Sequence, residues 1–305
     1  MYHKPVMLEA ALEGLAVKAG GTYVDATFGG GGHARAILQR LGEGRLVAFD
    51  QDEDALANLP DDDRLTFLNQ NFRYMKNFLK LYGYLPVDGI LADLGVSSHQ
   101  FDQAGRGFST RLEGPLDMRM NRHSEPSAKT VVNEYDTGRL AEVLRLYGEL
   151  RQSRKIAAAI DQARKEQPLE TTGELTDLLK RLAPRGRENK FMAQVFQALR
   201  IEVNSELGAL RELLIQSEEV LKDGGRLVVI SYHSLEDRLV KNYMRAGNFS
   251  GEPEKDFYGR IIRPFVPLWK PRTPEPAEVE ENSRARSARL RVAEKIKNQD
   301  GSKPI

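Results

Sequence analysis

The chain has 305 residues, of which 40% are hydrophobic and 29% charged, with 45 Lys and Arg against 44 Asp and Glu. This is the composition of a globular protein and not of a disordered or fibrous one, and the length allows one large domain or two of moderate size. The absence of cysteine excludes disulfides, thiolate nucleophiles and Cys-ligated metals. Because no secretory signal or membrane-spanning run is recognisable, we expect a cytoplasmic protein with no membrane partner.

Apolar runs alternate with helical segments over the first ninety residues. The predicted strands are 23–24, 45–49, 64–68 and 87–92, and the predicted helices are 33–41, 51–59 and 74–82. Strand, helix, strand, helix at this spacing is typical of a parallel, doubly wound sheet. We therefore expect an α/β protein with a Rossmann-like sheet.

More than a hundred residues separate the fourth predicted strand from the fifth, which follows a helix and a glycine turn. The fifth strand is predicted at 226–231, the helix at 204–221, the turn at 224–225, further helices at 138–150, 151–166 and 172–182, and a last edge strand at 287–295. A structureless loop of that length would be implausible inside a compact domain. We expect a helical domain, 104–203, inserted into a discontinuous sheet domain, 1–103 and 204–305, with fraying beyond 298.

Ligands of an open parallel sheet bind outside the carboxyl ends of its strands, where this chain carries four glycines at 29–32. The spacing Gly29-x-Gly31-x-x-Ala34 satisfies a loose dinucleotide fingerprint. Asp25, directly after the first strand, would repel a pyrophosphate but attract the α-amino group of S-adenosylmethionine. Asp25 therefore favours the sulfonium cofactor over a dinucleotide.

Two more residues follow predicted strands. Asp50 could accept hydrogen bonds from a ribose diol, a role common to both ligand classes. Phe72 could stack on adenine, although a core position is the commoner use of such a ring. For Asp25 and Asp50 the structural alternative is helix capping.

The fourth predicted strand ends at Asp93. Methyl transfer to an exocyclic amine needs a hydrogen-bond acceptor that draws the nitrogen lone pair out of the ring, and Asp93 is placed for that role. Alternatively, Asp93 fixes the amino group of the cofactor or caps the following turn. Gln100 could bind the cofactor or only solvent.

Tyr232 and His233 follow the fifth strand, and either could contact a base. A hydrolase triad of His233, Ser234 and Asp237 is rejected because no Gly-x-Ser-x-Gly elbow is present, and Ser234 is better explained as a helix start. The five histidines show no ligand spacing, so we expect no metal. Arg284, with three more arginines up to residue 291, forms a basic stretch free of acids, and a second group lies at 181–190. Each fits either a nucleic-acid backbone or a solvated face.

Segments in all parts of the chain also resemble one known family. The stretches are 3–6 (HKPV), 25–33 (DATFGGGGH), 88–98 (DGILADLGVSS) with Gln100, 106–109 (RGFS), 115–120 (PLDMRM), 196–201 (FQALRI) with 203–204 (VN), 231–238 (SYHSLEDR) and 284–291 (RARSARLR). In this order they closely resemble the ribosomal RNA small subunit methyltransferase H family, also called MraW. Tyr232 stands where the family more often has Phe, and Asp93-Leu-Gly-Val replaces the Asp/Asn-Pro-Pro-aromatic signature of amino methyltransferases.

The resemblance implies an S-adenosylmethionine-dependent enzyme that methylates the exocyclic N4 of a decoding-centre cytidine in 16S rRNA of the small ribosomal subunit. It implies cofactor contacts at Gly31, Gly32, His33, Asp50, Phe72, Asp93 and Gln100, whereas Asp25 rests on the charge argument alone. We expect in-line transfer to a base that leaves its stack.

The RNA contacts expected for that reaction are Phe108, Tyr232, His233, Arg284, Arg286 and Arg289, with the inserted domain recognising the substrate. Two other hypotheses stay open. One is a nicotinamide-dependent oxidoreductase on the same glycine loop, against which Asp25 argues. The other is an RNA-binding assembly factor that keeps the cofactor pocket without turnover.

Overall fold

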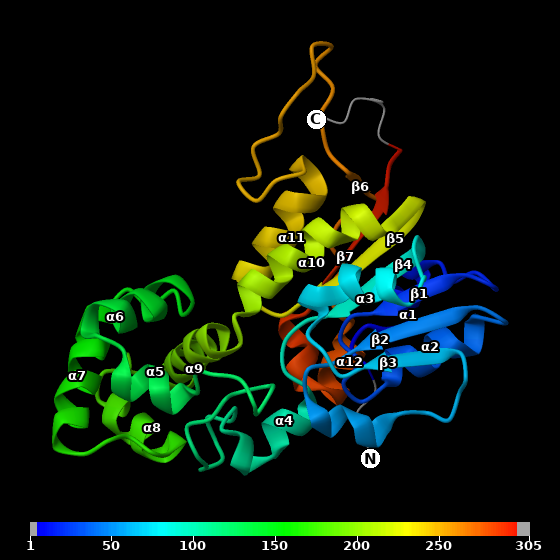
Figure 1. Cartoon of the computed structure of the whole chain (residues 1–305). Coiled ribbons are helices and arrows are strands. Elements are labelled where there is room, and N and C mark those ends of the chain that lie inside the picture. The colour runs from blue at the N-terminus through cyan, green and yellow to red at the C-terminus, as the bar shows by residue number, and fades with distance from the viewer. Residues whose placement is uncertain (1–4, 298–305) are drawn as a thin grey trace. The chain divides into compact units, whose positions relative to one another are not determined.

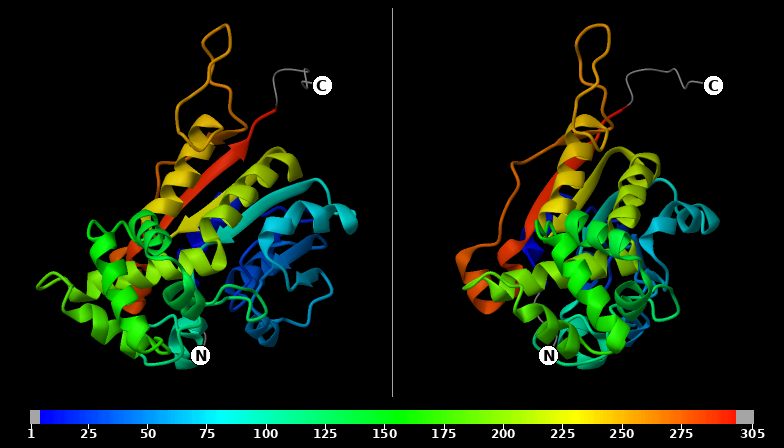
Figure 2. Two further views of the ribbon diagram at one scale, coloured as in Figure 1. Left: turned by 60° about the vertical axis from the view of Figure 1, so that its left-hand side comes forward. Right: turned by 90° about the vertical axis from the view of Figure 1, so that its left-hand side faces the viewer.

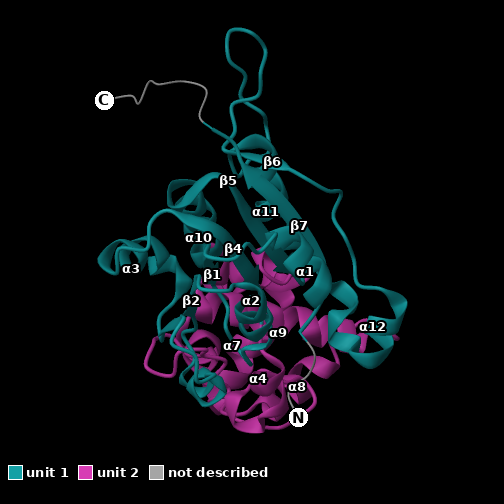
Figure 3. Cartoon of the chain, turned by 90° about the vertical axis from the view of Figure 1, so that its right-hand side faces the viewer, with its two compact units in different colours: residues 1–95, 208–305 teal, residues 96–207 magenta. Residues whose placement is uncertain are grey.

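A computed structural model describes residues 5–297, so residues 3–4 of the first matching stretch and the fraying expected beyond 298 lie outside it. The chain forms two compact units, residues 1–95 with 208–305, and residues 96–207 (Figure 3). Within the described part, no helix has the length and apolarity needed to cross a membrane. Each unit is described by itself below.

The first unit is built on a seven-stranded sheet in the order β3-β2-β1-β4-β5-β7-β6 (Figure 1). Its strands are β1 Thr22–Asp25, β2 Arg45–Phe49, β3 Leu65–Leu68, β4 Val87–Asp93, β5 Leu221–Ser231, β6 Phe265–Pro267 and β7 Arg289–Lys295. Strands β1 to β5 pair in parallel, while β7 runs antiparallel to β5 and to β6. The order 3-2-1-4-5 is that of a Rossmann-like sheet, which confirms the predicted fold class.

Helices cover both faces of this sheet. They are α1 Leu8–Leu15, α2 Gly32–Arg40, α3 Met75–Leu81, α10 Glu206–Val220, α11 Ser234–Ala246 and α12 Pro276–Glu281, with 3-10 turns η1 Glu53–Asn58, η2 Phe72–Tyr74 and η4 Ser283–Ser287. Leu46 and Ala48 of β2 belong to the buried core that includes α1 and α2, whereas Phe49 packs edge-to-face on Phe78 of α3, with ring centroids 6.3 Å apart. The period of two along a strand therefore divides the side chains between the two layers.

The C-terminal strand is not the sheet edge that we predicted. Strand β7 is paired on its outer side with β6, where Phe265 lies opposite Lys295 and Pro267 opposite Ala293. Strand β6 was not predicted from the sequence because prolines in this tail argue against a strand. Proline cannot donate to a ladder but is tolerated on an edge strand, and β6 is that edge.

Strand β5 also begins earlier than predicted. Leu221 pairs with Val87 and Arg226 with Gly89, so the predicted turn at 224–225 lies in an irregularity inside the strand. Gly224 has φ 77°, a conformation suited to glycine.

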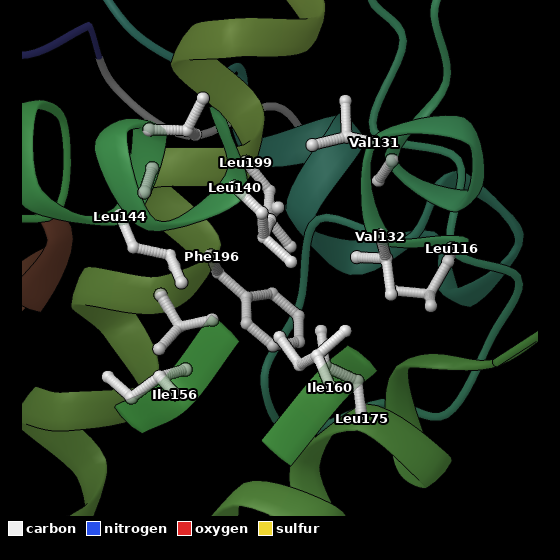
Figure 4. Packing of buried hydrophobic residues seen from close by; sticks show 14 of the residues in the cluster. Leu116, Val131, Val132, Leu140, Leu144, Ile156, Ile160, Leu175, Phe196 and Leu199 are labelled. Carbon is white, nitrogen blue, oxygen red and sulfur yellow. The ribbon is translucent and has the colours of Figure 1, made fainter. Parts of the chain in front are cut away.

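The second unit is helical and has its own core. Its helices are α4 Ser98–Asp102, α5 Ala128–Glu134, α6 Thr137–Leu146, α7 Ser153–Glu166, α8 Thr172–Lys180 and α9 Glu188–Asn204, with a 3-10 turn η3 Ala104–Arg106. Figure 4 shows Phe196 of α9 pointing into the space between Leu140 of α6 and Ile160 of α7, all three buried. The predicted helices in this region are confirmed as α6, α7 and α8.

Candidate cofactor site at the carboxyl edge of the sheet

Glycines make the bend that leads from β1 into α2. Gly31 occupies the N-cap position of α2 with φ 71°, in the left-handed region that glycine adopts most easily. A Cβ at Gly31 would lie 2.8 Å from the ring of Phe28, and a Cβ at Gly32 would collide with Pro5. The bend therefore requires glycine at both positions and brings bare backbone to the carboxyl edge of the sheet.

Asp25 ends β1 and is buried, with 1% of its surface exposed. Its Oδ1 accepts the backbone N–H of Thr27 at 3.1 Å, whereas Oδ2 has no hydrogen-bond partner among the described residues. The pKa of Asp25 is raised to about 7. Burial is the main cause and the charge of Asp50 adds to the rise, whereas the hydrogen bond from the Thr27 N–H opposes it. A buried carboxylate oxygen without a donor is costly in the ionised state, so this atom is suited to a cationic ligand.

Asp50 follows β2 and links that strand to the glycine bend. Its Oδ2 accepts the backbone N–H of Gly29 at 2.7 Å, and its Oδ1 accepts that of Asp52 at 2.9 Å. The cap of η1 is Asp52 and the cap of α2 is Gly31, so neither Asp25 nor Asp50 caps a helix. A carboxylate has about four lone-pair sites, so Asp50 can serve a ribose diol in addition to the backbone.

Asp93 ends β4 and meets Tyr232, which follows β5. The Tyr232 hydroxyl donates to Asp93 Oδ1 at 2.7 Å. Burial raises the pKa of Asp93 to about 7, with Asp25, Glu236 and Glu278 adding to the rise and the hydrogen bond from Tyr232 opposing it. The Asp93 side chain is 22% exposed, so a ligand can still reach this carboxylate.

His33 and Phe72 lie near the same strand ends. His33 in the first turn of α2 is buried, and its Nδ1 lies 3.8 Å from Asp93 Oδ2, which is longer than a hydrogen bond. Burial lowers the pKa of His33 to about 4, so the ring is neutral near pH 7, and its Nε2 has no partner among the described residues. Phe72 begins η2 after β3 and is half-buried, so part of its ring surface remains exposed.

The segment after β5 fixes Tyr232 through a helix cap. Helix α11 begins at Ser234, as predicted. Glu236 Oε2 accepts the backbone N–H of Tyr232 at 2.9 Å and that of His233 at 3.4 Å, and Glu236 Oε1 lies 3.2 Å from His233 Nε2. Sequence reasoning missed Glu236 as this support, although an acid three residues into a helix is a known capping signal.

Gln100 and Phe108 belong to the helical unit. Gln100 Oε1 accepts the backbone N–H of Ser97 at 3.0 Å in the capping box of α4. Phe108 is 3% exposed in the core of that unit, with the guanidinium carbon of Arg106 5.8 Å from its ring centroid. Both side chains thus have structural contacts inside their own unit.

Three members of the arginine stretch are exposed, and the fourth is half-buried. Arg284, Arg286 and Arg289 are exposed on η4 and at the start of β7. Arg291 forms two hydrogen bonds with the carboxylate of Asp237, at 2.7 and 3.1 Å, and Arg289 lies 3.4 Å from the same group. Arg291 therefore anchors β7 to α11, with the exposed Arg289 as a second contact to the same carboxylate.

This fold, with acids at the ends of β1, β2 and β4 around a glycine bend, is that of a Rossmann-like methyltransferase. The sequence profile of the MraW methylase family matches residues 1–296. The chain belongs to this family, as its motifs predicted.

Two relatives of known name agree with that assignment. The chain is 55% identical over 296 residues to ribosomal RNA small subunit methyltransferase H of Christiangramia forsetii, covering 97% of this chain and 98% of that protein. It is likewise 55% identical to the protein of that name from Bacteroides thetaiotaomicron, covering 96% and 97%. Among solved structures, an rRNA methylase from Streptococcus thermophilus aligns with a TM-score of 0.44 at 12% identity, covering 97% and 100% of the two chains.

Proposed function

We propose that this protein transfers the methyl group of S-adenosylmethionine to the exocyclic N4 amine of a decoding-centre cytidine in 16S rRNA, acting in the cytoplasm on the small ribosomal subunit or its RNA. Relatives named ribosomal RNA small subunit methyltransferase H, matched over nearly the whole chain, support the RNA substrate. The cofactor assignment depends chiefly on one observation: the buried Oδ2 of Asp25 beside the glycine bend has no hydrogen-bond partner within residues 5–297.

The charges at the sheet edge fit this cofactor. S-adenosylmethionine supplies an electrophilic methyl group on a sulfonium and also carries an ammonium group. Asp25 Oδ2 would accept from the ammonium, Asp50 from the ribose diol, and Phe72 would cover the adenine. Asp25 would repel the pyrophosphate of a dinucleotide, which argues against a nicotinamide-dependent oxidoreductase.

Asp93 would act on the substrate amine. The Tyr232 hydroxyl occupies Oδ1, so Oδ2 is the atom that would accept a hydrogen bond from the cytidine N4–H and draw the nitrogen lone pair out of the ring. Transfer of the methyl group would break its bond to the sulfonium sulfur and leave the nitrogen cationic, and Asp93 would take up the proton that this nitrogen loses and pass it to water. The pKa of Asp93, about 7, suits such an acceptor at neutral pH.

Tyr232 supports the same step in two ways. Burial raises the pKa of its hydroxyl well above 10, so it remains a donor to Asp93 at all relevant pH values. A base hydrogen-bonded to Asp93 would also lie within reach of the Tyr232 ring, as expected for an RNA contact. We further propose that the exposed Arg284, Arg286 and Arg289 bind phosphates, and that the helical unit recognises the substrate.

Transfer of tritium from methyl-labelled cofactor to small-subunit RNA tests this proposal. The wild-type protein should label the RNA, and Asp93→Ala should label it at least about a hundredfold more slowly, as expected for loss of a proton acceptor. Asp62→Ala is a matched control because it removes an acid whose ion pair is with Arg64. RNA binding without transfer by the wild type would favour an assembly factor, and tight NAD binding without a response to S-adenosylhomocysteine would favour an oxidoreductase.

A further inference from the structure

A hairpin at 252–263 projects beyond α11 and β6 in each view of the chain (Figures 1 and 2). Its tip exposes Phe257 to 98% and Tyr258 to 80%, with Ile262 exposed to 57%. Clustered apolar side chains at this level of exposure mark an interaction surface. None of the cofactor-site residues described above belongs to this hairpin.

Hydrogen bonds hold the tip in one shape. The N–H of Asp256 donates to the carbonyl of Arg260 at 2.9 Å, and the N–H of Ile262 donates to that of Glu254 at 2.9 Å. The Asp256 carboxylate accepts the N–H groups of Tyr258 and Arg260 at 2.9 and 2.8 Å. The aromatic pair is therefore presented by a preformed turn, which lowers the entropic cost of binding.

The base of the hairpin is fixed to α11. Asn242 donates to the carbonyl of Phe249 at 3.0 Å, and Arg245 donates to that of Gly251 at 2.8 Å. At its other end, α11 begins two residues after Tyr232. A helix of 13 residues is roughly 20 Å long. The base of the hairpin therefore lies about one helix length from the Asp93–Tyr232 pair, and its tip projects farther, so an RNA segment of several nucleotides would join the two.

The chemistry of the tip favours RNA. The Phe257 and Tyr258 rings meet edge-to-face at 88°, with centroids 5.6 Å apart, so the edge of one ring contacts a face of the other and the remaining faces stay uncovered by this contact. The guanidinium carbon of Arg260 lies 5.9 Å from the Tyr258 ring centroid, and Lys255 is exposed beside it. Open aromatic faces with flanking cations are how proteins bind unpaired bases. A stable protein interface needs about 800 Å² per partner, more than a tip of this size supplies.

We infer that residues 255–262 form a stacking platform for an unpaired RNA segment near the methylated nucleotide. This inference rests on the proposed function for the identity of the RNA. It adds a contact that the carboxyl edge of the sheet does not provide.

The test compares the full-length double variant Phe257→Ala/Tyr258→Ala with the wild type. Loss of two stacked bases should weaken binding to protein-free small-subunit RNA by at least about 30-fold and raise the KM for RNA similarly. The kcat at saturating RNA and the affinity for S-adenosylhomocysteine should not change. Phe257→Trp, which keeps a stacking face, should bind like the wild type. Leu81→Ala is the matched control, since Leu81 on α3 is also 75% exposed.

Two results would overturn the platform. One is an unchanged affinity of the double variant for protein-free RNA. If binding to assembled subunits nevertheless becomes weaker, the tip contacts a ribosomal protein and not RNA. The other is a change in oligomeric state, which indicates a second copy of this chain. Failure of the proposed function would give a different result from failure of the platform, because the wild-type protein would then bind RNA without transferring methyl groups.

Discussion

The hydroxyl of Tyr232 donates to Asp93 across 139 positions of sequence. Strands β4 and β5 are neighbours in the sheet, so the residues at their carboxyl ends meet although the helical unit separates them in the chain. This contact fixes one oxygen of Asp93 and lowers the pKa of a carboxylate that burial and three nearby acids raise. Tyr232 therefore sets the pH range in which Asp93 is an acceptor.

Tyr232→Phe should move the acidic limb of the kcat profile to higher pH. Without the hydroxyl, the pKa of Asp93 rises above its present value near 7, so a smaller fraction of the carboxylate is ionised at pH 7. Activity should fall several-fold at pH 7 and recover toward that of the wild type at pH 9. A uniform loss at every pH would contradict this role and indicate that the variant only disturbs packing.

Asp25→Asn should bind S-adenosylhomocysteine more weakly. The variant loses a charge-assisted hydrogen bond to the ligand ammonium, worth about 1.5–3 kcal/mol or roughly 10- to 100-fold in affinity. Titration calorimetry measures this directly. An unchanged affinity would remove the charge argument for the cofactor.

The same variant should make the protein more stable at pH 8. The folded pKa of Asp25 is about 7, well above its unfolded value, so ionisation destabilises the fold as pH rises from about 4 to 7, and the cost is fully present above pH 7. Asparagine carries no charge at any pH. The gain in the free energy of unfolding should be about 1–3 kcal/mol at pH 8 and should vanish near pH 4 in urea denaturation. If the variant is less stable than the wild type at pH 8, ionised Asp25 does not destabilise the fold.

Asp50→Ala should weaken binding of the same ligand by roughly tenfold or more, because it removes the acceptor for the ribose and releases Gly29 from β2. Asp50→Asn keeps an acceptor and should lose less. Equal affinities for the wild type and Asp50→Ala would refute the ribose assignment.

Arg286→Gln/Arg289→Gln should flatten the salt dependence of RNA binding. Each lost phosphate contact lowers the slope of log K against log salt by about 0.7 to 0.9. Arg291→Gln is the contrast, since it leaves Asp237 without its bidentate partner and should lower stability by about 1–3 kcal/mol. An unchanged slope in the double variant would identify the stretch as a solvated face.

The sequence predicted most of the sheet and the acids at its carboxyl edge. Strands β2 and β4 are apolar runs that end at Asp50 and Asp93. Such local patterns can be recognised from the sequence alone. Because parallel strands end at one edge, topology alone placed Asp25 with them. The family motifs added His33, which has no strand-end signal of its own.

The remaining features depend on contacts distant in sequence. Strand β6 is three residues long and contains Pro267, so only its pairing with β7 defines it. Asp93 forms a hydrogen bond with Tyr232, and Arg291 forms an ion pair with Asp237. In both cases the partners are far apart in the sequence, and no local sequence pattern predicts the contact. The exposure of Phe257 follows from the projection of its hairpin and could not be read from residue type.

Mass spectrometry of digested small-subunit RNA tests the central claim most directly. The RNA is incubated with S-adenosylmethionine and either the wild-type protein or Asp93→Ala. We predict a single N4-methylcytidine in the decoding-centre fragment with the wild type, and almost none with the variant. A methyl group on a ribose, on a ring carbon or on another nucleoside, or RNA left unmodified by the wild type, would contradict the account.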